Sequence, residues 1–402
     1  MIQNVFIIGS KGIPGAYGGY ETFVDRLTEY HQQNKKVQYH VACKGKRAEE
    51  KEYHHARCFY VNVPNLGPAQ AIYYDVAALH ACVSYVKKNH IENPIIYILA
   101  CRIGPFARYY LKKIHRFGGK MFVNPDGHEW KRSKWNWFVR RYWKISERLM
   151  VKNSDLLVCD SENIERYIRE EYKKYAPHTT YISYGADVSE ENPEVKNAYQ
   201  DWLSEHGLQR GGYYLIVGRF VPENNYETMI REFMESRTER KLVIICNENP
   251  KLKQLLEKKL EYTRDTRICF VGTVYDNKLL MNIRRFAFAY LHGHEVGGTN
   301  PSLLEALGST DVNLLLDVGF NREVGMDSAV YWNKEPKTLA NLIDKVDNMS
   351  DGERRKLGQK AKDRIREAYS WKKIADEYEK LFVQGEKNSE STVGRPNSES
   401  CI

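Results

Sequence analysis

A glycine-rich turn that leads from an apolar strand into a helix holds the residues of this chain best suited to binding an anion. Residues 290–308 read YLHGHEVGGTNPSLLEALG, and the apolar run at 286–291 predicts a strand. The next segment predicts a helix that begins near Pro301. A glycine turn at a helix N-terminus directs backbone N–H groups and the positive end of the helix dipole at one place. This pattern therefore suits a diphosphate.

Five residues of this turn and helix fit a nucleotide. Gly297 and Gly298 leave room for a ligand to approach the backbone, while Thr299 and Asn300 supply hydroxyl and amide donors. Glu305 lies about one turn into the helix, where a carboxylate would accept hydrogen bonds from a pair of ribose hydroxyls. The alternative interpretation is an ordinary strand–turn–helix unit with an exposed glutamate.

A second glycine loop lies near the start of the chain. Residues 3–9 predict a buried strand, residues 10–19 (SKGIPGAYGG) form a loop with four glycines, and a helix is expected over 20–31. The loop has neither the G-x-G-x-x-G spacing of a dinucleotide-binding fold nor the spacing of a P-loop. A dinucleotide-dependent oxidoreductase, a rival from another enzyme class, is therefore disfavoured.

A turn after the predicted strand 120–124 offers acidic and imidazole groups in the sequence NPDGHEW. We predict that Asp126 binds or deprotonates an acceptor hydroxyl and that His128 contacts a donor sugar. The alternative is that Asp126 caps a helix starting near Lys131 and that His128 is a turn residue. The functional interpretation is favoured because this turn would end a strand at a ligand cleft.

The chain has no spacing typical of a metal site. His292 and His294 have no third ligand nearby in the sequence, and no D-x-D motif occurs. The nearest match, Asp160-Ser161-Glu162, follows a predicted strand and is better explained as a cap of the next helix. We expect neither a metal nor another cofactor.

Strands and helices alternate along the chain, which indicates parallel sheets with right-handed crossovers. The predicted strands are 3–9, 37–43, 58–63, 95–100, 120–124, 155–160, 179–182, 213–217, 242–246, 268–271, 286–291 and 312–316. The predicted helices of the first half are 20–31, 69–89, 104–117, 131–152 and 162–174. The polar stretch 184–212 is the predicted linker. The fold class is therefore α/β, with two doubly wound, Rossmann-like halves facing a central cleft.

Length and composition fit a two-domain protein of 402 residues. No apolar run approaches the roughly 18 residues of a membrane span, and the N-terminus lacks the pattern of a secretory signal. The eight cysteines show no C-x-x-C spacing, and several lie in apolar runs. We expect a cytoplasmic protein with reduced, buried cysteines.

The net charge of +9 is concentrated in one segment. Residues 102–152 hold fourteen Lys and Arg against three acids, and they interleave with Trp130, Trp135, Trp137, Phe138 and Trp143. Cations mixed with tryptophans suit an anionic membrane surface. The first alternative is a solvated basic helix with its tryptophans in the core. A nucleic-acid surface ranks last, because no recognised binding fold accompanies the patch.

Six motifs together resemble glycosyltransferase family 4, which has the GT-B fold, and more closely its bacterial β-1,4 rhamnosyltransferase branch of rhamnan and capsule polysaccharide biosynthesis. They are KGIPGAYGGYETF (11–23), NPDGHEWKRSKW (124–135), CDSENI (159–164), YISYGAD (181–187), VGRFVPENN (217–225) and HGHEVGGTNPSLLEA (292–306). The resemblance extends to about residue 385. It implies an acceptor-binding domain over 1–190, a nucleotide-sugar-binding domain over 191–370, a helix at 371–385 that returns to the first domain, and a disordered tail at 386–402.

The resemblance also implies roles for individual residues. The donor site would comprise Gly18, Gly19, Arg219, Asn224, Gly297, Gly298, Thr299, Asn300 and Glu305. Acceptor and membrane contacts would come from Tyr17, Glu129, Trp130, Lys131, Arg132, Trp135 and Trp137. Arg219 would pair with the donor diphosphate through its planar fork.

Two positions depart from the family pattern. Asn224 stands where the family usually has a phosphate-binding lysine. Gly297 stands where the family usually has a glutamate that touches the sugar ring, and Glu295 lies two residues too early. A 6-deoxy sugar has one fewer hydroxyl to hold, which fits a loop without that glutamate.

The implied activity is a metal-independent, retaining transfer of L-rhamnose from dTDP-β-L-rhamnose to a saccharide on a polyprenyl diphosphate. The linkage would be β-1,4, and the enzyme would lie on the inner face of the plasma membrane. Two alternatives stay open: a family 4 transferase with another nucleotide sugar, and a non-catalytic GT-B protein that binds a sugar lipid. Whether the acceptor sugar is glucose or N-acetylglucosamine is left open.

Overall fold

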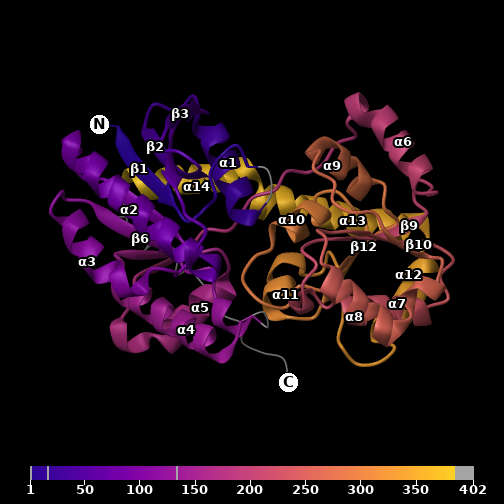
Figure 1. Ribbon diagram of the computed structural model, residues 1–402. Helices are drawn as coiled ribbons and strands as arrows, with labels where there is room; N and C mark the ends of the chain where they lie inside the picture. Colours follow the sequence, from indigo (N-terminus) through magenta and orange to yellow (C-terminus); the bar gives the residue numbers. More distant parts are fainter. Residues whose placement is uncertain (1, 16–17, 133–134, 385–402) are drawn as a thin grey trace, which may run out of the picture.

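The computed structural model describes residues 2–15, 18–132 and 135–384, which form two α/β halves side by side. In each half, helices cover a parallel sheet on both of its faces (Figure 1). The prediction of two doubly wound halves is confirmed. The domain boundaries drawn from the sequence stay a prediction.

The first sheet has eight strands in the described residues, ordered β3-β4-β2-β1-β5-β6-β7-β8, and all of its pairings are parallel except that of β3 with β4. The strands are β1 (Gln3–Ile8), β2 (Val37–Gly45), β3 (Glu50–Tyr53), β4 (Ala56–Asn62), β5 (Ile95–Leu99), β6 (Lys120–Asn124), β7 (Leu156–Cys159) and β8 (Thr179–Tyr181). Strands buried on both faces read as continuous apolar runs, which made the central ones recognisable. The analysis of the sequence missed β3, a short and polar edge strand (EKEY).

The second sheet has six parallel strands in the described part of the chain, ordered β11-β10-β9-β12-β13-β14. They are β9 (Tyr213–Val217), β10 (Lys241–Ile245), β11 (Ile268–Phe270), β12 (Ala289–His292), β13 (Asn313–Leu316) and β14 (Val330–Trp332). The sequence did not predict β14, because three residues are too few to display a period.

Helices connect these strands. Those of the first half are α1 (Gly19–His31), α2 (Gln70–Lys88), α3 (Gly104–His115), α4 (Trp137–Lys152) and α5 (Glu162–Glu171). Those after β8 are α6 (Lys196–Glu205), α7 (Tyr226–Glu235), α8 (Pro250–Leu260), α9 (Asn277–Arg285), α10 (Pro301–Leu307), α11 (Gly319–Gly325), α12 (Thr338–Asp347), α13 (Asp351–Arg364) and α14 (Trp371–Gln384).

Two segments differ from the prediction. The helix expected over 131–152 begins only at Trp137, because the Asn136 side chain caps it by accepting from Val139 N at 3.0 Å. Asp126 therefore does not cap this helix. The predicted linker 184–212 contains α6, whose inner face (Tyr199, Trp202 and Leu203) is buried although the helix is polar overall.

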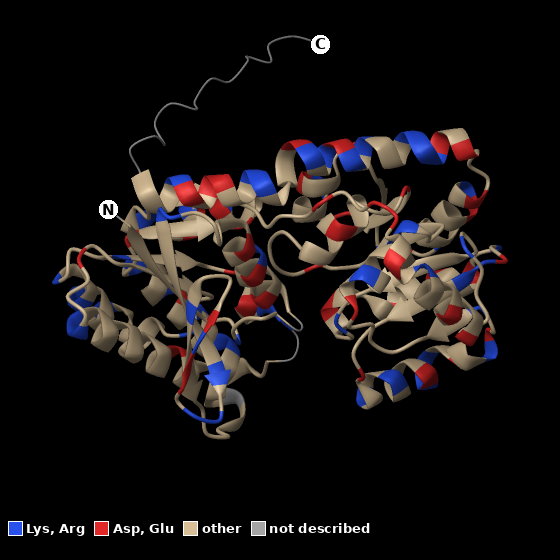
Figure 2. Cartoon of the chain, turned by 90° about the horizontal axis from the view of Figure 1, so that it is seen from above, with Lys and Arg blue, Asp and Glu red and all other residues tan. Residues whose placement is uncertain are grey.

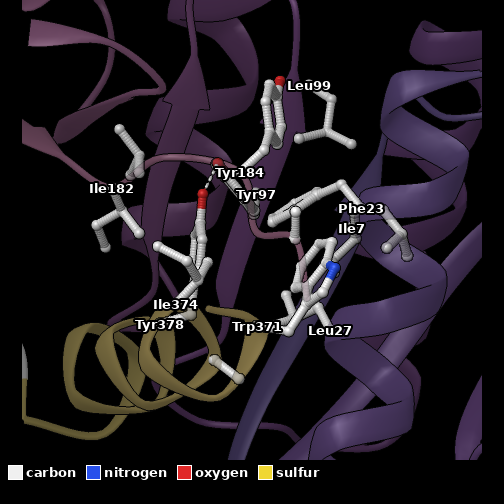
Figure 3. Close-up of a cluster of buried hydrophobic side chains, with 14 of the residues drawn as sticks. Ile7, Phe23, Leu27, Tyr97, Leu99, Ile182, Tyr184, Trp371, Ile374 and Tyr378 are labelled. Atoms are coloured by element: carbon white, nitrogen blue, oxygen red, sulfur yellow. Dashed lines mark hydrogen bonds between the residues drawn. The ribbon is translucent and has the colours of Figure 1, made fainter. Parts of the chain in front are cut away.

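The last helix packs against the first half of the chain. In Figure 2 the α13–α14 segment runs along both halves and carries mixed charges. Figure 3 shows Trp371, Ile374 and Tyr378 of α14 among buried side chains of the first half, and the hydroxyl of Tyr378 lies 3.1 Å from that of Tyr97. Burial of this aromatic cluster joins the end of the chain to the first sheet.

Two expectations from composition bear on the described residues. Cys43, Cys58, Cys82, Cys101, Cys159 and Cys246 are buried and unpaired, and Cys269 is half-buried and unpaired. Among the described helices, none combines the length and the apolar character needed to cross a bilayer.

Candidate active site

A cavity of about 690 Å³ lies between the two halves. Its walls include residues that follow the carboxyl ends of strands in both sheets, among them Ser10 after β1, Asp126 after β6, Arg219 after β9 and Gly293 after β12. Ligands of open parallel sheets bind at such ends. Both glycine loops predicted from the sequence line this cavity.

The first glycine loop, residues 10–19, is braced by the helix that follows it. Lys11 N donates to Glu21 Oε1 at 2.7 Å, and Gly15 N donates to Asp25 Oδ2 at 2.9 Å. Gly18 has a φ of 129°, which residues with a side chain rarely adopt. It occupies the N-cap position of α1 and has no side chain to cap the helix. The N-terminus of this 13-residue helix therefore keeps N–H groups for a ligand.

The second glycine loop, residues 293–300, contacts the first half of the chain. A Cβ on Gly298 would overlap the Asp160 carboxylate, and Thr299 Oγ1 donates to the Asp160 carbonyl at 2.6 Å. Asn300 Oδ1 accepts from Ser302 N at 2.9 Å and so caps α10. The Thr299 hydroxyl and the Asn300 carbonyl are thus engaged within the protein, while Gly297, with a φ of 131°, lines the cavity.

Arg219 places a cation on the cavity wall. It is exposed, and within the described part of the chain its guanidinium makes no ion pair or side-chain hydrogen bond. Asn224 supports the same loop, because its Nδ2 donates to the Arg219 carbonyl at 2.8 Å and its Oδ1 lies 2.8 Å from His294 Nδ1. Asn224, which stands where the family 4 pattern has a lysine, therefore joins two loops.

Glu305 also lines the cavity, and it is paired with an arginine that the sequence analysis missed. Arg284 Nη1 lies 2.7 Å from Glu305 Oε2, and the arginine side chain is only 3% exposed. Arg284 stands in an Arg-Arg pair at the end of α9, where cations normally stabilise the helix dipole. Because cations are common at that position, nothing in the sequence distinguished Arg284.

Glu295 is not among the residues that line the cavity. Both of its carboxylate oxygens lie 2.6 Å from Lys334 Nζ, and Asn225 Nδ2 donates to Oε2 at 3.2 Å. The second glycine loop thus brings no glutamate to the place where the family pattern has one.

Asp126 lies on the side of the cavity formed by the first half. Its backbone is left-handed, with a φ of 57°, and its Oδ2 lies 3.8 Å from Arg132 Nη2. Burial raises the pKa of the Asp126 carboxyl, and the Arg132 charge opposes that rise. Glu129 pairs with Arg132 and accepts from Trp135 Nε1 at 3.0 Å. All four residues line the cavity.

His128 is not among the lining residues. Its ring centroid lies 4.1 Å from that of Tyr167, in an aromatic group that includes Trp130. Burial lowers the pKa of His128 to about 4, with further lowering by the charges of Lys131 and Lys144. Trp130 and Lys131 do not line the cavity either.

The Asp160 carboxyl also lines the cavity, although its motif was interpreted from the sequence only as a helix cap. Ser161 does cap α5 as predicted, accepting from Asn163 N at 3.1 Å. Asp160 itself is 3% exposed, and its pKa is raised well above the usual value by burial and then by the Asp126 charge. The motif CDSEN (159–163) was the feature of the sequence that could have pointed to Asp160.

In the basic, aromatic segment 102–152, some aromatic side chains are buried and others are exposed. Trp143 is buried, whereas Trp137 is 63% and Phe138 is 76% exposed. Tyr17 lies outside the described residues.

Comparisons with known proteins agree on the architecture. The model of a domain of unknown function, DUF1972, matches residues 2–187. An uncharacterized glycosyltransferase of Methanocaldococcus jannaschii, MJ1069, is 22% identical over 92% of this chain and 96% of its own length. Sucrose-phosphate synthase from Thermosynechococcus elongatus superposes with a TM-score of 0.78 at 17% identity, over 95% of this chain and 98% of the other.

The fold is that of the GT-B glycosyltransferases. Anabaena Alr3699/HepE, solved in complex with UDP and glucose, superposes with a TM-score of 0.66 at 11% identity. That alignment covers 96% of this chain and all of the Anabaena chain. Together with the curated relative, these structures support a glycosyltransferase.

Proposed function

We propose that this GT-B protein transfers a sugar from a nucleoside diphosphate to an acceptor hydroxyl. The observation that carries the proposal is the cavity between the halves, which is lined by the start of α1, the Arg219 cation and the Glu305 carboxylate. Among the described residues, Arg219 has no ion-pair partner. A helix N-terminus and an arginine suit a diphosphate, and a carboxylate suits sugar hydroxyls. The binding of UDP and glucose by the Anabaena protein supports the same class of ligand.

The proposed donor is dTDP-β-L-rhamnose. Its support is the resemblance of the HGHEVGGTNP loop to the rhamnosyl branch and the direction of Glu295, which pairs with Lys334 outside the cavity lining. A loop without a carboxylate for the sugar fits a 6-deoxyhexose, which has one fewer hydroxyl to bind.

The proposed chemistry is a retaining, metal-independent transfer in which the leaving diphosphate helps to take the acceptor proton. Its main requirements are positioning and stabilisation of the developing negative charge, to which the α1 N-terminus and Arg219 contribute. Asp126 would bind the acceptor hydroxyl or accept its proton, since its carboxylate lines the same cavity.

The proposed acceptor is a saccharide on a polyprenyl diphosphate, extended by a β-1,4 linkage at the inner face of the plasma membrane. The exposed aromatics Tyr109, Trp137 and Phe138 lie on α3 and α4, which pack against each other and carry exposed cations such as Arg140 and Arg141. We expect binding to vesicles that contain anionic lipid and weaker binding to neutral ones. Retention on neither kind of vesicle would remove this part of the proposal.

The decisive experiment incubates the full chain with dTDP-L-rhamnose and a synthetic lipid-linked N-acetylglucosamine or glucose in the presence of EDTA. A mass gain of one deoxyhexosyl unit supports donor, transfer and metal independence together. Glu305→Ala should abolish the gain, while Glu295→Ala, the matched control outside the cavity lining, should retain it.

The other outcomes separate the alternatives. Turnover with a different nucleotide sugar and none with dTDP-rhamnose would replace the donor. Donor binding without turnover on either acceptor would favour another acceptor or a non-catalytic sugar-lipid-binding protein.

A further inference from the structure

The His294 side chain is held in one orientation at the wall of the cavity. Its Nδ1 lies 2.8 Å from Asn224 Oδ1, and its backbone carbonyl accepts from Asn321 Nδ2 at 3.1 Å. Its ring packs edge to face against that of Phe320, with the centroids 5.6 Å apart. The residue is buried and lines the cavity. These contacts fix where both ring nitrogens lie.

The hydrogen bonds of Asn224 determine which ring nitrogen of His294 carries the proton. A carbonyl oxygen can only accept, so the Asn224 atom that lies 2.8 Å from the Arg219 carbonyl is the amide nitrogen. The amide oxygen therefore faces His294 Nδ1, which must donate to it. Burial lowers the pKa of this imidazole well below its usual value, so the ring is neutral. His294 Nε2 consequently carries a lone pair and no hydrogen.

This lone pair borders an open part of the cavity. Within the described part of the chain, Nε2 of His294 makes no hydrogen bond. A Cβ built on Gly297 would lie 3.5 Å from Nε2, so the atom faces the space that this glycine leaves empty. After burial and His292, the charges of Arg132 and Arg219 lower the imidazole's pKa further, which places both cations near the ring. The site therefore suits a ligand with an anion for Arg219 and a hydrogen-bond donor beside that anion.

We propose that His294 Nε2 accepts a hydrogen bond from a hydroxyl of the transferred sugar and is a specificity-determining atom of the donor site. The sugar is bonded directly to the diphosphate, so its hydroxyls are the donors nearest to the group that Arg219 would bind. Glu295, the carboxylate of the same loop, pairs with Lys334 and does not line the cavity. The inference rests on the proposed function, since it assigns a contact within the same donor site.

His294→Asn separates the two contacts of the ring. Its amide nitrogen can replace Nδ1 as the donor to Asn224, whereas nothing replaces Nε2. Calorimetric titration of the full chain with dTDP and with dTDP-L-rhamnose measures the contribution of the sugar as the ratio of the two dissociation constants. We expect the constant for dTDP to stay within about twofold of the wild-type value. The constant for dTDP-L-rhamnose should rise about 3- to 10-fold, the size of one neutral hydrogen bond.

His294→Gln makes the opposite change. Its amide oxygen can take the place of Nε2, whereas the hydrogen bond to Asn224, which supports the Arg219 loop, is lost. Both dissociation constants should therefore rise by a similar factor, and the contribution of the sugar should be kept. His206→Asn is the matched control, because the His206 Nδ1 lies 2.8 Å from the Trp202 carbonyl and outside the cavity lining. It should leave both constants unchanged.

Three results of these titrations distinguish the inference from the proposed function. An unchanged ratio in folded His294→Asn would overturn the contact and leave the proposed function intact. Equal weakening of dTDP and dTDP-L-rhamnose in that variant would do the same, because the contact would then be to the nucleotide. Binding of neither ligand by the wild type would overturn both the inference and the proposed donor.

Proton linkage gives a readout on the wild-type chain. Titration with dTDP-L-rhamnose near neutral pH, in two buffers of different ionisation enthalpy, should show no proton uptake, because a neutral Nε2 accepts from a hydroxyl without changing charge. Uptake of about one proton that His206→Asn keeps and His294→Gln removes would mean that an imidazolium pairs with the diphosphate. That result would overturn the proposal.

Discussion

Both loops are rich in glycine, but they differ in what holds them and in how the following helix is capped. The first loop (residues 10–19) is braced from within its own half by Glu21 and Asp25, and α1 starts without a side-chain cap. The second loop (residues 293–300) is held by the other half, through contacts with Asp160, and α10 is capped by Asn300. The helix after the first loop therefore lacks the side-chain cap that α10 has, while the second loop joins the two halves.

The ionisable side chains beside the two loops also differ in the direction of their pKa shifts. On the side of the first half, burial raises the pKa values of the carboxyls of Asp126 and Asp160. On the side of the second loop, burial lowers the pKa of His292 to about 3 and that of His294 well below its usual value. Titration of a carboxyl above its usual range is therefore expected on the first side, and the imidazoles of the second side stay neutral.

The largest effect is expected from a methyl group at Gly298, where the second glycine loop contacts the first half. Gly298→Ala would place Cβ against the Asp160 carboxylate, so the buried Asp160 side chain or the loop must shift. Activity should fall by about 100-fold, as displaced catalytic groups do, and the free energy of unfolding by about 1–3 kcal/mol. Turnover and denaturant unfolding measure the two effects.

The matched control lies in the other loop. A Cβ at Gly19 would meet Pro301 Cγ at 3.6 Å, an ordinary contact, so Gly19→Ala should keep the wild-type unfolding free energy. Equal destabilisation by both substitutions would contradict the distinction between the loops.

The next effect concerns the diphosphate. Arg219→Met should weaken binding of UDP by about 10- to 100-fold, since a charge-assisted hydrogen bond contributes about 1.5–3 kcal/mol. Arg237→Met, which removes an exposed arginine paired with Asp344, should leave the affinity unchanged in the same titration. If both variants bound UDP like the wild type, Arg219 would have no part in the site.

The pH profile tests which side carries proton transfer. If Asp126 acts ionised, kcat/KM should fall about tenfold per pH unit below the carboxyl's raised pKa, a limb that starts above the ordinary value of 3.8. Asp126→Asn should remove this limb along with most of the activity. His294→Gln should leave the limb unchanged, because the imidazole is neutral throughout. An inflection near 6.5 that His294→Gln removes would contradict this assignment.

The smallest effect is expected from one hydroxyl of the second loop. Thr299→Val removes the hydrogen bond to the Asp160 carbonyl at nearly constant shape and should cost about 1 kcal/mol of unfolding free energy. Ser302→Ala serves as the control for a hydroxyl that bonds within the second half, to the Val217 carbonyl. Because the Thr299 hydroxyl contacts the first half, Thr299→Val should also increase proteolytic cleavage between the halves, and Ser302→Ala should not.

The fold was predictable because buried parallel strands give apolar runs that alternate with helical spacing. β3 and β14 were missed because one is polar and the other has three residues, and α6 because its buried face is narrow. The glycine loops and Glu305 were found from local patterns. Arg284 and Asp160 were not assigned roles in the site, since their contacts with Glu305 and Gly298 depend on the packing of separate elements.

A single donor site between the two halves is tested most directly by hydrogen–deuterium exchange of the full chain with and without UDP. We expect the nucleotide to slow amide exchange in both glycine loops and at the N-terminus of α1, because all of them line one cavity. Protection confined to one loop, or absent from both while UDP binds elsewhere, would contradict a single donor site between the two halves.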